Sequence, residues 1–481
     1  MHTHPMRRLI ILLATVISAQ DAELVLRTMV GYNTMRATVP PTSAKKEEAT
    51  SLGELAATAG RAGKFGDAMR HYHHGIAVMQ GFPWWTPEIE LAAGLQASVD
   101  DAIANPGQQL LLTLSSLYPA TGPATAKVAI ALRAAVPGAA PITLARAREI
   151  KSTELPLTLT VELPASAHGN YEIIATLGEA ENPALRNVLR KSVPIRVAEL
   201  SAAAAQLKAR LAKSANPTAA YALTLYENAE NGKANPHRTD FAKAFADANK
   251  LLDDATDGKD PFFNKTGDLK KAYRSAVDQT LQPYRLFIPS TYDATKPAPL
   301  VITLHGMGGD ESSMFDGYGG SGALKNEAEK HGFILASPKG REPASMYRGA
   351  AEKDVLDVLA EVRRDYKVDP KRIYLMGHSM GGYGTWSIAM AHPEKFAALG
   401  PIAGGGDPRG MEKIKNIPHF IVHGDNDKTV PVTQSRIMVD AGKKLDVKIE
   451  YIEVPGGSHV DIAVPNFGKM FDFFAKQARE N

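Results

Sequence analysis

Apolar residues with helical spacing mark the first structured part of the chain. Between residues 44 and 104 they recur in two stretches, Leu52, Leu55, Ala56 and Ala59 and then Phe65, Ala68, Met69 and Tyr72. Gly63 lies between the two stretches, and a Pro-Trp-Trp-Thr-Pro segment follows at residues 83–87. This pattern predicts a helical hairpin within residues 20–105, similar to a single tetratricopeptide unit.

The period changes to two after Pro106. In LPLTLTVEL (155–163), leucine and valine alternate with other residues, which is typical of a strand. Similar short runs are separated by Pro, Gly and Asn and lie at Gln109–Leu114, Lys127–Leu132, Tyr171–Leu177 and Val193–Val197. They predict a small β-sandwich, immunoglobulin-like in general form, over residues 106–200. Residues 201–277 return to an Ala-rich helical pattern and predict a helical linker.

Strands and helices alternate in the last part of the chain, residues 278–481. Its apolar, β-branched runs are Leu300–Leu304, Phe333–Ser337, Ile373–Met376, Phe420–Val422 and Val447–Val454. Helical patterns such as DVLDVLAEVRR (354–364) lie between most of them. This alternation predicts an α/β domain whose mostly parallel sheet has helices on both faces. In such sheets the active site forms beyond the carboxyl ends of the strands.

Composition and charge limit the partners and the compartment. The net charge of +3 is small for 481 residues, so we expect neither nucleic acid nor an anionic membrane as a partner. The chain has no cysteine, which excludes disulfides, thiolate nucleophiles and thiolate metal sites.

The N-terminus has the pattern of a secretory signal peptide. Arg7 and Arg8 precede the apolar run Leu9–Ala19, which is too short to span a bilayer of about 30 Å. A buried first helix or a misplaced start is the alternative. No other stretch of the sequence is apolar enough to span a membrane. With residues 1–19 as a signal and no disulfides, we expect a secreted or periplasmic bacterial protein.

A candidate nucleophile stands at the end of a predicted strand. The sequence GHSMG (377–381) follows Ile373–Met376 directly and precedes the helical stretch Tyr383–Ala391. Its glycines permit a sharp strand-to-helix turn that presents the hydroxyl of Ser379 above backbone N–H groups at the helix start. A bare G-x-S-x-G pattern is weak, but the strand before it and the helix after it make it specific.

An acid and a base follow in the order that this arrangement requires. Asp427 lies in HGDND (423–427) after one strand, and His459 lies in GGSH (456–459) after the last strand. A neutral imidazole must take the serine proton, and a carboxylate must orient that imidazole and stabilise its charged form. Asp425 is the first alternative for the acid and Asp461 the second. We expect His423 to be structural and His378 to shape the turn around the nucleophile.

Backbone N–H groups complete the predicted site. The segment HGMGG (305–309) follows the strand Leu300–Leu304, where a fold of this kind supplies one donor of an oxyanion hole. We assign Met307 as this donor, with Gly306 or Gly308 as alternatives. Met380, directly after the nucleophile, supplies the second.

From about Leu281 onward the chain resembles the α/β-hydrolase carboxylesterases related to feruloyl esterases, acetyl-xylan esterases and polyhydroxybutyrate depolymerases. The segments that carry the resemblance are LHGMGG (304–309), DPKRIYLMGHSMGGYGTW (369–386), PIAGGGDP (401–408) and HGDNDKTVPV (423–432). The family implies Ser379, Asp427 and His459 as the triad, in agreement with their spacing. The sequence departs from many relatives at Val460-Asp461, where an aromatic residue is common.

The expected reaction is the hydrolysis of a carboxylic ester through an acyl-enzyme, without metal or organic cofactor. The short interval between Ile402 and Ile417 leaves little room for a large lid, which favours short acyl groups or esters on polymers. A prolyl-oligopeptidase-like serine peptidase is the alternative within hydrolases. A glycan- or partner-binding protein with an accessory hydrolase domain is the alternative from another class.

Two N-terminal features suggest ligands only weakly. The sequence HYHH (71–74) places His71 and His74 on one helix face, but no carboxylate flanks them, so we expect no metal site. Trp84 and Trp85 could stack on sugar rings of a polysaccharide, although an aromatic pair beside prolines is more often a packed corner.

Overall fold

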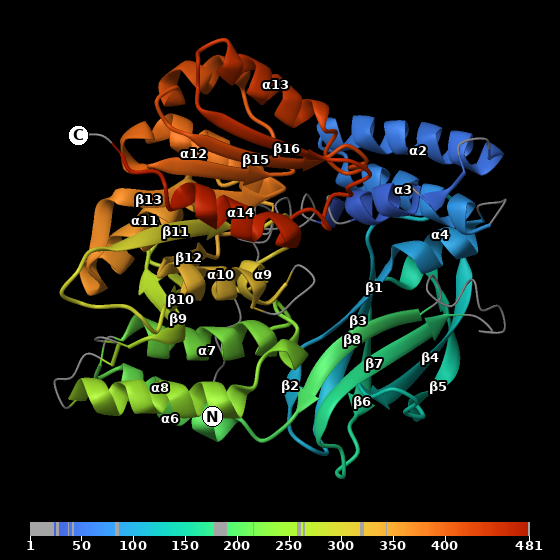
Figure 1. The fold of residues 1–481 in the computed structure, drawn as a ribbon. Helices are drawn as coiled ribbons and strands as arrows, with labels where there is room; N and C mark the ends of the chain where they lie inside the picture. The colour runs from blue at the N-terminus through green and yellow to red at the C-terminus, as the bar shows by residue number, and fades with distance from the viewer. Residues whose placement is uncertain are drawn as a thin grey trace. The chain divides into compact units, whose positions relative to one another are not determined.

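The computed structural model describes residues 24–479 except for 26–27, 37, 41–42, 82–85, 178–189, 215, 257–260, 263–264, 318–321 and 343. The predicted signal peptide and the pair Trp84-Trp85 lie outside the described residues. The chain forms two compact units (Figure 1). The first comprises residues up to Ala205 together with Leu225–Ala244, and the second comprises Gln206–Thr224 and Phe245 onward.

The first unit contains a helical hairpin, which follows helical residues at 28–36. Helices α2 (Ala44–Arg61) and α3 (Phe65–Gln80) are joined by three residues, and α3 ends at Gly81, whose φ of 100° is a glycine C-cap. The predicted apolar face of α3 is buried at Ala68, Met69 and Tyr72. On α2 the buried residues are Ala49 and Ala56, whereas Leu55 is 52% exposed, contrary to prediction. One residue turns a helix by about 100°, so Leu55 faces away from the face that carries Ala56.

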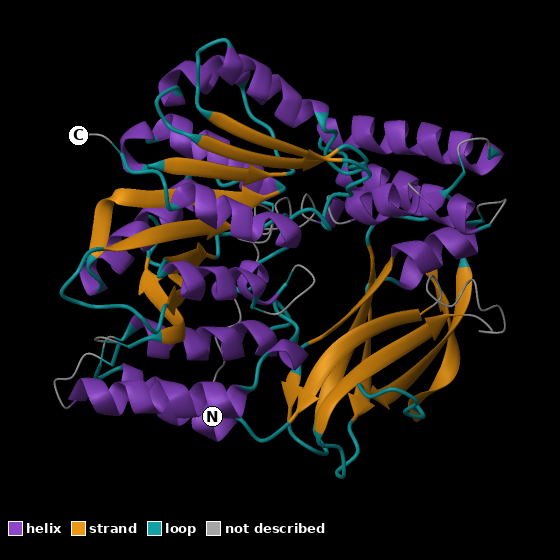
Figure 2. Ribbon diagram, in the orientation of Figure 1, coloured by secondary structure: helices purple, strands orange, loops and turns teal. Residues whose placement is uncertain are grey.

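A β-sandwich follows a short helix, α4 (Pro87–Gly94). Its strands are β1 (Leu95–Val99), β2 (Ile103–Ala104), β3 (Gln109–Ser116), β4 (Thr125–Ala134), β5 (Ile142–Lys151), β6 (Leu157–Glu162), β7 (Gly169–Leu177) and β8 (Arg190–Val197). They form two sheets, in the orders β1-β3-β6 and β2-β8-β7-β4-β5, with β2 parallel to β8 (Figure 2). This order has the general form of an immunoglobulin-like sandwich.

The core of the sandwich follows the period-two pattern. Leu110, Leu112 and Leu114 of β3 are fully buried, and they share one apolar cluster with alternate residues of β4 and β7. The strands β1, β2 and β5 were not predicted. Because β1 begins directly after α4, at Leu95, the sandwich starts earlier than the predicted residue 106.

The predicted linker is shorter than expected and is divided between the units. It contains α6 (Ser201–Leu211), α7 (Pro217–Glu230) and α8 (Phe241–Thr256). Strand β9 (Gly267–Arg274) then begins the sheet of the second unit, so the predicted boundary at residue 278 was too late. Polar residues alternate along β9 because it is an edge strand, and this concealed it in the sequence.

The second unit contains an eight-stranded sheet in the order β16-β15-β14-β13-β11-β12-β10-β9. Its other strands are β10 (Leu281–Ile288), β11 (Ala298–Leu304), β12 (Ile334–Pro338), β13 (Val368–His378), β14 (Ala398–Ile402), β15 (His419–Gly424) and β16 (Ile449–Val454). Strand β10 is antiparallel to both its neighbours, and β11 to β16 are parallel. The predicted mostly parallel sheet is confirmed. It also contains three strands that were not predicted, β9, β10 and β14.

Helices cover both faces of this sheet, as predicted (Figures 1 and 2). One face is packed by α11 (Ala350–Asp365), α12 (Met380–Ala391) and α13 (Thr433–Lys443), and the other by α10 (Ala323–His331) and α14 (Val464–Phe474). Along β11, Leu300 and Ile302 point to the first cluster and Val301 to the second. A short helix, α9 (Ser313–Asp316), precedes α10. Among the described helices, none combines the length and the apolar character needed to cross a membrane.

Candidate active site

Ser379 stands at a tight turn between β13 and α12. Its φ of 56° and ψ of −116° lie in a sparsely populated region for a residue with a side chain, which is the strained geometry of a nucleophile elbow. Two glycines make the turn possible. A Cβ atom on Gly377 would lie 2.4 Å from the carbonyl oxygen of Gly381, and one on Gly381 would lie 2.1 Å from that of Leu304. The turn thus holds the half-buried Ser379 side chain at the carboxyl end of the sheet.

The structure brings Ser379, His459 and Asp427 into one hydrogen-bonded relay. The Nε2 atom of His459 lies 2.9 Å from the Ser379 Oγ atom, and its Nδ1 atom lies 2.7 Å from an Asp427 carboxylate oxygen. The three residues come from the loops after β13, β15 and β16. An ionised Asp427 fixes the proton on Nδ1 and leaves Nε2 able to accept the serine proton.

The environment of Asp427 favours its charged form. The side chain is buried, and burial alone would raise the pKa of the carboxyl group. The hydrogen bonds from His423, His459 and the Val430 backbone N–H outweigh burial and hold the pKa of Asp427 well below its usual range. The Thr429 N–H also donates to this carboxylate at 2.8 Å. These contacts therefore favour the carboxylate form of Asp427.

The two alternative acids hold loops and do not touch the imidazole. Asp425 is exposed and accepts a hydrogen bond of 2.7 Å from the backbone N–H of Gly456. Asp461 is exposed and accepts one of 2.8 Å from the N–H of Ser458. Among the candidates, Asp427 alone lies within hydrogen-bond distance of His459 Nδ1.

Two further histidines support the relay, and their roles were only partly foreseen. His423 is fully buried, and its Nε2 atom lies 3.3 Å from the Asp427 carboxylate and 2.9 Å from the Val430 carbonyl oxygen. His378 lies 2.6 Å from the backbone carbonyl oxygen of His459, and burial lowers its pKa to about 4. A neutral His378 must therefore donate through Nε2, which fixes the backbone that carries the base. The sequence alone does not reveal the hydrogen-bond partners of His378 and His423.

The two residues predicted to supply the oxyanion hole, Met307 and Met380, follow the ends of adjacent strands. Leu304 at the end of β11 pairs with Gly377 at the end of β13, so the loop after one strand lies next to the elbow after the other. In that loop Gly306–Gly309 forms a turn, with a hydrogen bond of 3.1 Å between its ends and a φ of 81° at Gly308. Met307 occupies the second position of the turn. Met380 is the first residue of α12, so its N–H has no acceptor within the helix.

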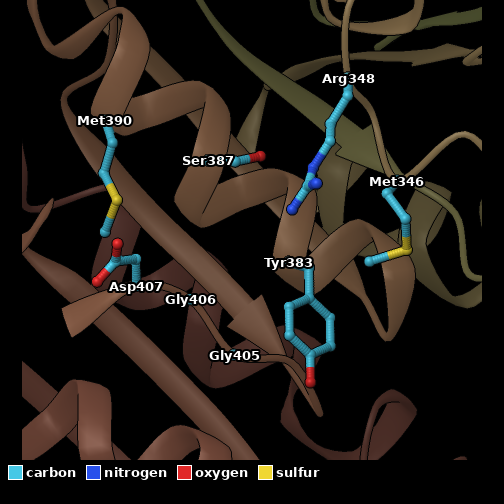
Figure 3. Close-up of a pocket in the computed structure, with 8 residues that line it drawn as sticks. All are labelled: Met346, Arg348, Tyr383, Ser387, Met390, Gly405, Gly406 and Asp407. Carbon is cyan, nitrogen blue, oxygen red and sulfur yellow. The ribbon is translucent and has the colours of Figure 1, made fainter. Parts of the chain in front are cut away.

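A pocket of 320 Å³ begins one helical turn beyond the nucleophile (Figure 3). One wall is the face of α12 that carries Tyr383, Ser387 and Met390, which are spaced four and three residues apart. Tyr383 is half-buried, and burial and the nearby Asp427 carboxylate raise the pKa of its hydroxyl group. Tyr383 thus lines the pocket and lies close enough to Asp427 to feel its charge.

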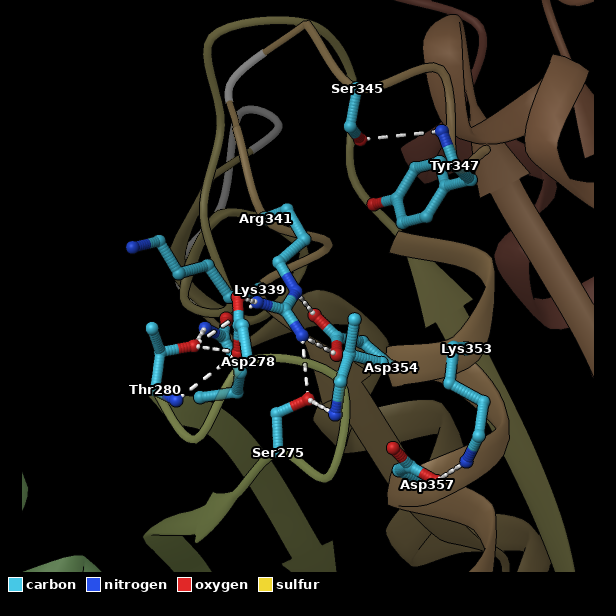
Figure 4. A network of polar contacts seen from close by, with 12 residues as sticks. Ser275, Asp278, Thr280, Lys339, Arg341, Ser345, Tyr347, Lys353, Asp354 and Asp357 are labelled. Carbon is cyan, nitrogen blue, oxygen red and sulfur yellow. Dashed lines mark hydrogen bonds and ion pairs between the residues drawn. The ribbon is translucent and has the colours of Figure 1, made fainter. Parts of the chain in front are cut away.

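The loop between β12 and α11 forms the opposite wall of the pocket. Met346 and Tyr347 have φ values of 51° and 50°, a left-handed conformation that costs energy for residues with side chains. Tyr347 is fully buried, where Gly340 and Gly384 leave room for its ring. Figure 4 shows the loop's polar anchor, in which Arg341 pairs with the buried carboxylate of Asp354. Buried contacts at both ends thus hold this strained loop.

Removing the anchor is expected to destabilise the second unit. The Arg341 and Asp354 side chains are 11% and 2% exposed, and their closest atoms are 2.6 Å apart. Arg341→Met leaves a buried carboxylate without its cation, which typically costs about 3–5 kcal/mol. Urea unfolding should show this loss, and the double variant Arg341→Met/Asp354→Leu should recover at least half of it. Arg364→Met, at a site that is 62% exposed, serves as control and should change stability by less than about 0.5 kcal/mol. A loss below about 1 kcal/mol in Arg341→Met would contradict the anchor.

One histidine of α3, His73, has a buried polar partner. The Nδ1 atom of His73 lies 2.8 Å from the hydroxyl of Tyr118, and burial lowers the pKa of His73 to about 4. Within the described parts of the chain, no group of three or more His, Asp or Glu residues is arranged to hold a metal ion.

Several known proteins are similar to parts of this chain. A family model described as PET hydrolase-like matches residues 343–475. A bifunctional acetylxylan esterase/xylanase from Neocallimastix patriciarum is 30% identical over 140 residues, which are 28% of this chain and 20% of that protein. A probable feruloyl esterase C from Aspergillus terreus is 27% identical over 195 residues, which are 38% of this chain and 66% of that protein.

A crystal structure of a thermostable esterase covers 80% of this chain and 100% of its own, with 18% identity and a TM-score of 0.41. Of the two sequence relatives, the chain spans 20% of the length of the acetylxylan esterase/xylanase and 66% of the length of the feruloyl esterase. The elbow, the relay and the strand order are those of an α/β hydrolase. The sequence matches add a similarity to ester hydrolases of the α/β-hydrolase fold, which for the family model lies within residues 343–475.

Proposed function

We propose that this protein is a serine hydrolase that cleaves carboxylic esters, with Ser379 as nucleophile, His459 as base and Asp427 as acid. The observation that carries the proposal is the unbroken relay from Ser379 Oγ through His459 to the buried Asp427, with distances of 2.9 and 2.7 Å. A serine hydroxyl is a poor nucleophile unless an adjacent base removes its proton, and this relay supplies that base.

The reaction has two steps. Ser379 Oγ bonds to the ester carbonyl carbon as its proton moves to His459 Nε2, and the N–H groups of Met307 and Met380 stabilise the oxyanion. The bond to the alcohol oxygen then breaks, and the alcohol leaves with the proton from His459. Water next attacks the acyl-enzyme, gives a proton to His459, and releases the carboxylic acid as Ser379 recovers its hydroxyl. Asp427 remains ionised throughout and stabilises the imidazolium.

Esters with short acyl groups or esters on polymers, of the feruloyl or acetyl-xylan kind, fit this site best. The interval between β14 and β15 contains only the short 3-10 helix η4 (Pro408–Ile414), which supports an open site without a large lid. The relatives described above are an acetylxylan esterase/xylanase and a probable feruloyl esterase C by name. The peptidase and pure binding alternatives are not favoured, because the relay is complete and the relatives are ester hydrolases. We also propose export to the periplasm or the medium, on the pattern of residues 1–19.

Hydrolysis and covalent labelling together test the proposal. The protein should hydrolyse 4-nitrophenyl acetate and butyrate, and diisopropyl fluorophosphate should abolish this activity with a single adduct on Ser379, located by peptide mass spectrometry. The reagent reacts only with an activated serine, so the adduct reports the relay and not mere exposure. A folded protein without activity on either ester, or an adduct at another residue, would overturn the proposal. Faster cleavage of a prolyl anilide than of the esters would favour the peptidase.

A further inference from the structure

The pocket beside Tyr383 has apolar walls and a backbone floor. Met346 and Met390 line it from opposite sides with their thioether groups, and the ring of Tyr383 lines it as well (Figure 3). Gly405 and Gly406 form part of the lining without side chains. A Cβ atom on Gly405 would lie 3.1 Å from a ring carbon of Tyr383, so a larger residue there would crowd the pocket wall. This space accommodates the apolar body of a small group.

Arg348 supplies a positive charge to this pocket. Figure 3 shows its guanidinium extending from the β12–α11 loop towards α12, between Ser387 and Tyr383. Within the described part of the chain, no carboxylate forms an ion pair with Arg348 and no side chain accepts a hydrogen bond from it. The buried Tyr347 ring next to it and the Arg341–Asp354 anchor fix the loop that presents it.

The acidic residue of the pocket is already neutralised. Asp407 accepts hydrogen bonds of 2.9 and 2.7 Å from the Nε and Nη2 atoms of Arg409, and one of 3.0 Å from that residue's backbone N–H. These bonds from Arg409 lower the pKa of Asp407. Arg348 therefore gives the pocket one uncompensated positive charge above apolar walls.

We propose that this pocket binds an anionic group, a carboxylate, that the substrate carries on one side of its scissile ester. The inference rests on the proposed esterase function and deepens it by naming a class of substrate, the half-ester of a short dicarboxylic acid or the ester of a hydroxy acid. Guanidinium binds carboxylate through paired N–H groups, and the thioether walls contact the chain between the two ends.

The helix sets the distance between the two ends of the substrate. With a rise of about 1.5 Å per residue, Tyr383 and Ser387 lie roughly 6 and 12 Å from Ser379 along α12. Arg348 lines the same pocket as these two side chains. An extended chain covers about 1.2 Å per bond, so the carboxylate should lie about five to ten bonds from the ester carbonyl. Adipic acid, with its carboxyl carbons five bonds apart, has the shortest matching chain.

Two pairs of probes test the inference. On the acyl side, the 4-nitrophenyl half-ester of adipic acid is compared with the methyl 4-nitrophenyl diester, which has the same chain without the charge. On the alcohol side, 6-acetoxyhexanoate is compared with its methyl ester. In at least one pair, kcat/KM should favour the charged probe by about tenfold at low salt. This preference should fall towards unity in 1 M NaCl, because the Debye length shrinks to about 3 Å.

Arg348→Gln should remove the preference and leave kcat/KM for the neutral esters within about twofold. Arg348→Lys should keep part of it, because the charge remains and the planar fork is lost. Arg363→Gln removes the same charge from the exposed far end of α11 and should keep the full preference. Charged-to-neutral ratios near one in both pairs, or ratios unchanged in Arg348→Gln, would overturn the inference while the neutral esters still report the esterase. Loss of all ester hydrolysis in the native protein would instead overturn the proposed function, and the inference with it.

Discussion

Replacing Ser379 with alanine should lower kcat for 4-nitrophenyl butyrate by about a millionfold, the scale of loss seen when a relay loses its nucleophile. The substitution removes only the hydroxyl group, whose oxygen lies 2.9 Å from His459 Nε2. His459 then has no serine proton to accept. The fold should not change, because alanine keeps the Cβ atom and the backbone bond of 2.9 Å from residue 379 N–H to the Ile402 carbonyl oxygen. Stopped assays over hours, with urea unfolding in parallel, measure both.

The double variant sharpens this test. Since Ser379 and His459 act as one unit, Ser379→Ala/His459→Ala should be no slower than either single variant. Losses that multiply would mean that the two residues contribute independently, which contradicts the relay. A kcat reduced less than about a hundredfold in Ser379→Ala would point to another nucleophile.

Sequence patterns predicted which three residues the structure brings together, because the order of the motifs and their places at strand ends are local features of this fold. Ser379, Asp427 and His459 were each predicted from a short motif directly after an apolar strand, and parallel strands bring such loops to the same edge of a sheet. The glycine motif could be recognised from the sequence because the tight turn leaves no space for a Cβ atom at residues 377 and 381.

What the sequence could not provide was the support around these residues. The bond from His378 to the His459 carbonyl joins positions 81 residues apart, and the Arg341–Asp354 pair links a loop to a helix whose packing must be known first. The edge strand β9 was missed because its exposed, polar alternation is weak and it follows helices. The strand β1 was missed because it begins at the residue after α4 ends. In each case tertiary contacts, and not local preference, decide the structure.

Replacing Asp427 with asparagine should lower kcat/KM for the same ester by about ten-thousandfold, although the side chain keeps its shape. Asparagine can present an amide N–H or a neutral carbonyl to Nδ1, which either imposes the wrong tautomer or leaves the imidazolium without a counter-charge. The buried carboxylate also accepts bonds from Thr429 N–H and Val430 N–H, so its charge holds the loop as well as the base.

Asp425→Asn is the matched control, two residues away in the same loop. Its carboxylate is exposed and bonds the Gly456 N–H, a contact that an asparagine oxygen can keep, so kcat/KM should change less than about threefold. If Asp425→Asn proved the more damaging of the two, the acid would be misassigned and the loop after β15 would have to move before catalysis. If both were mild, His459 would not need a buried carboxylate. The depressed pKa of Asp427 argues against that result, because two histidines and the backbone stabilise its charge at that point.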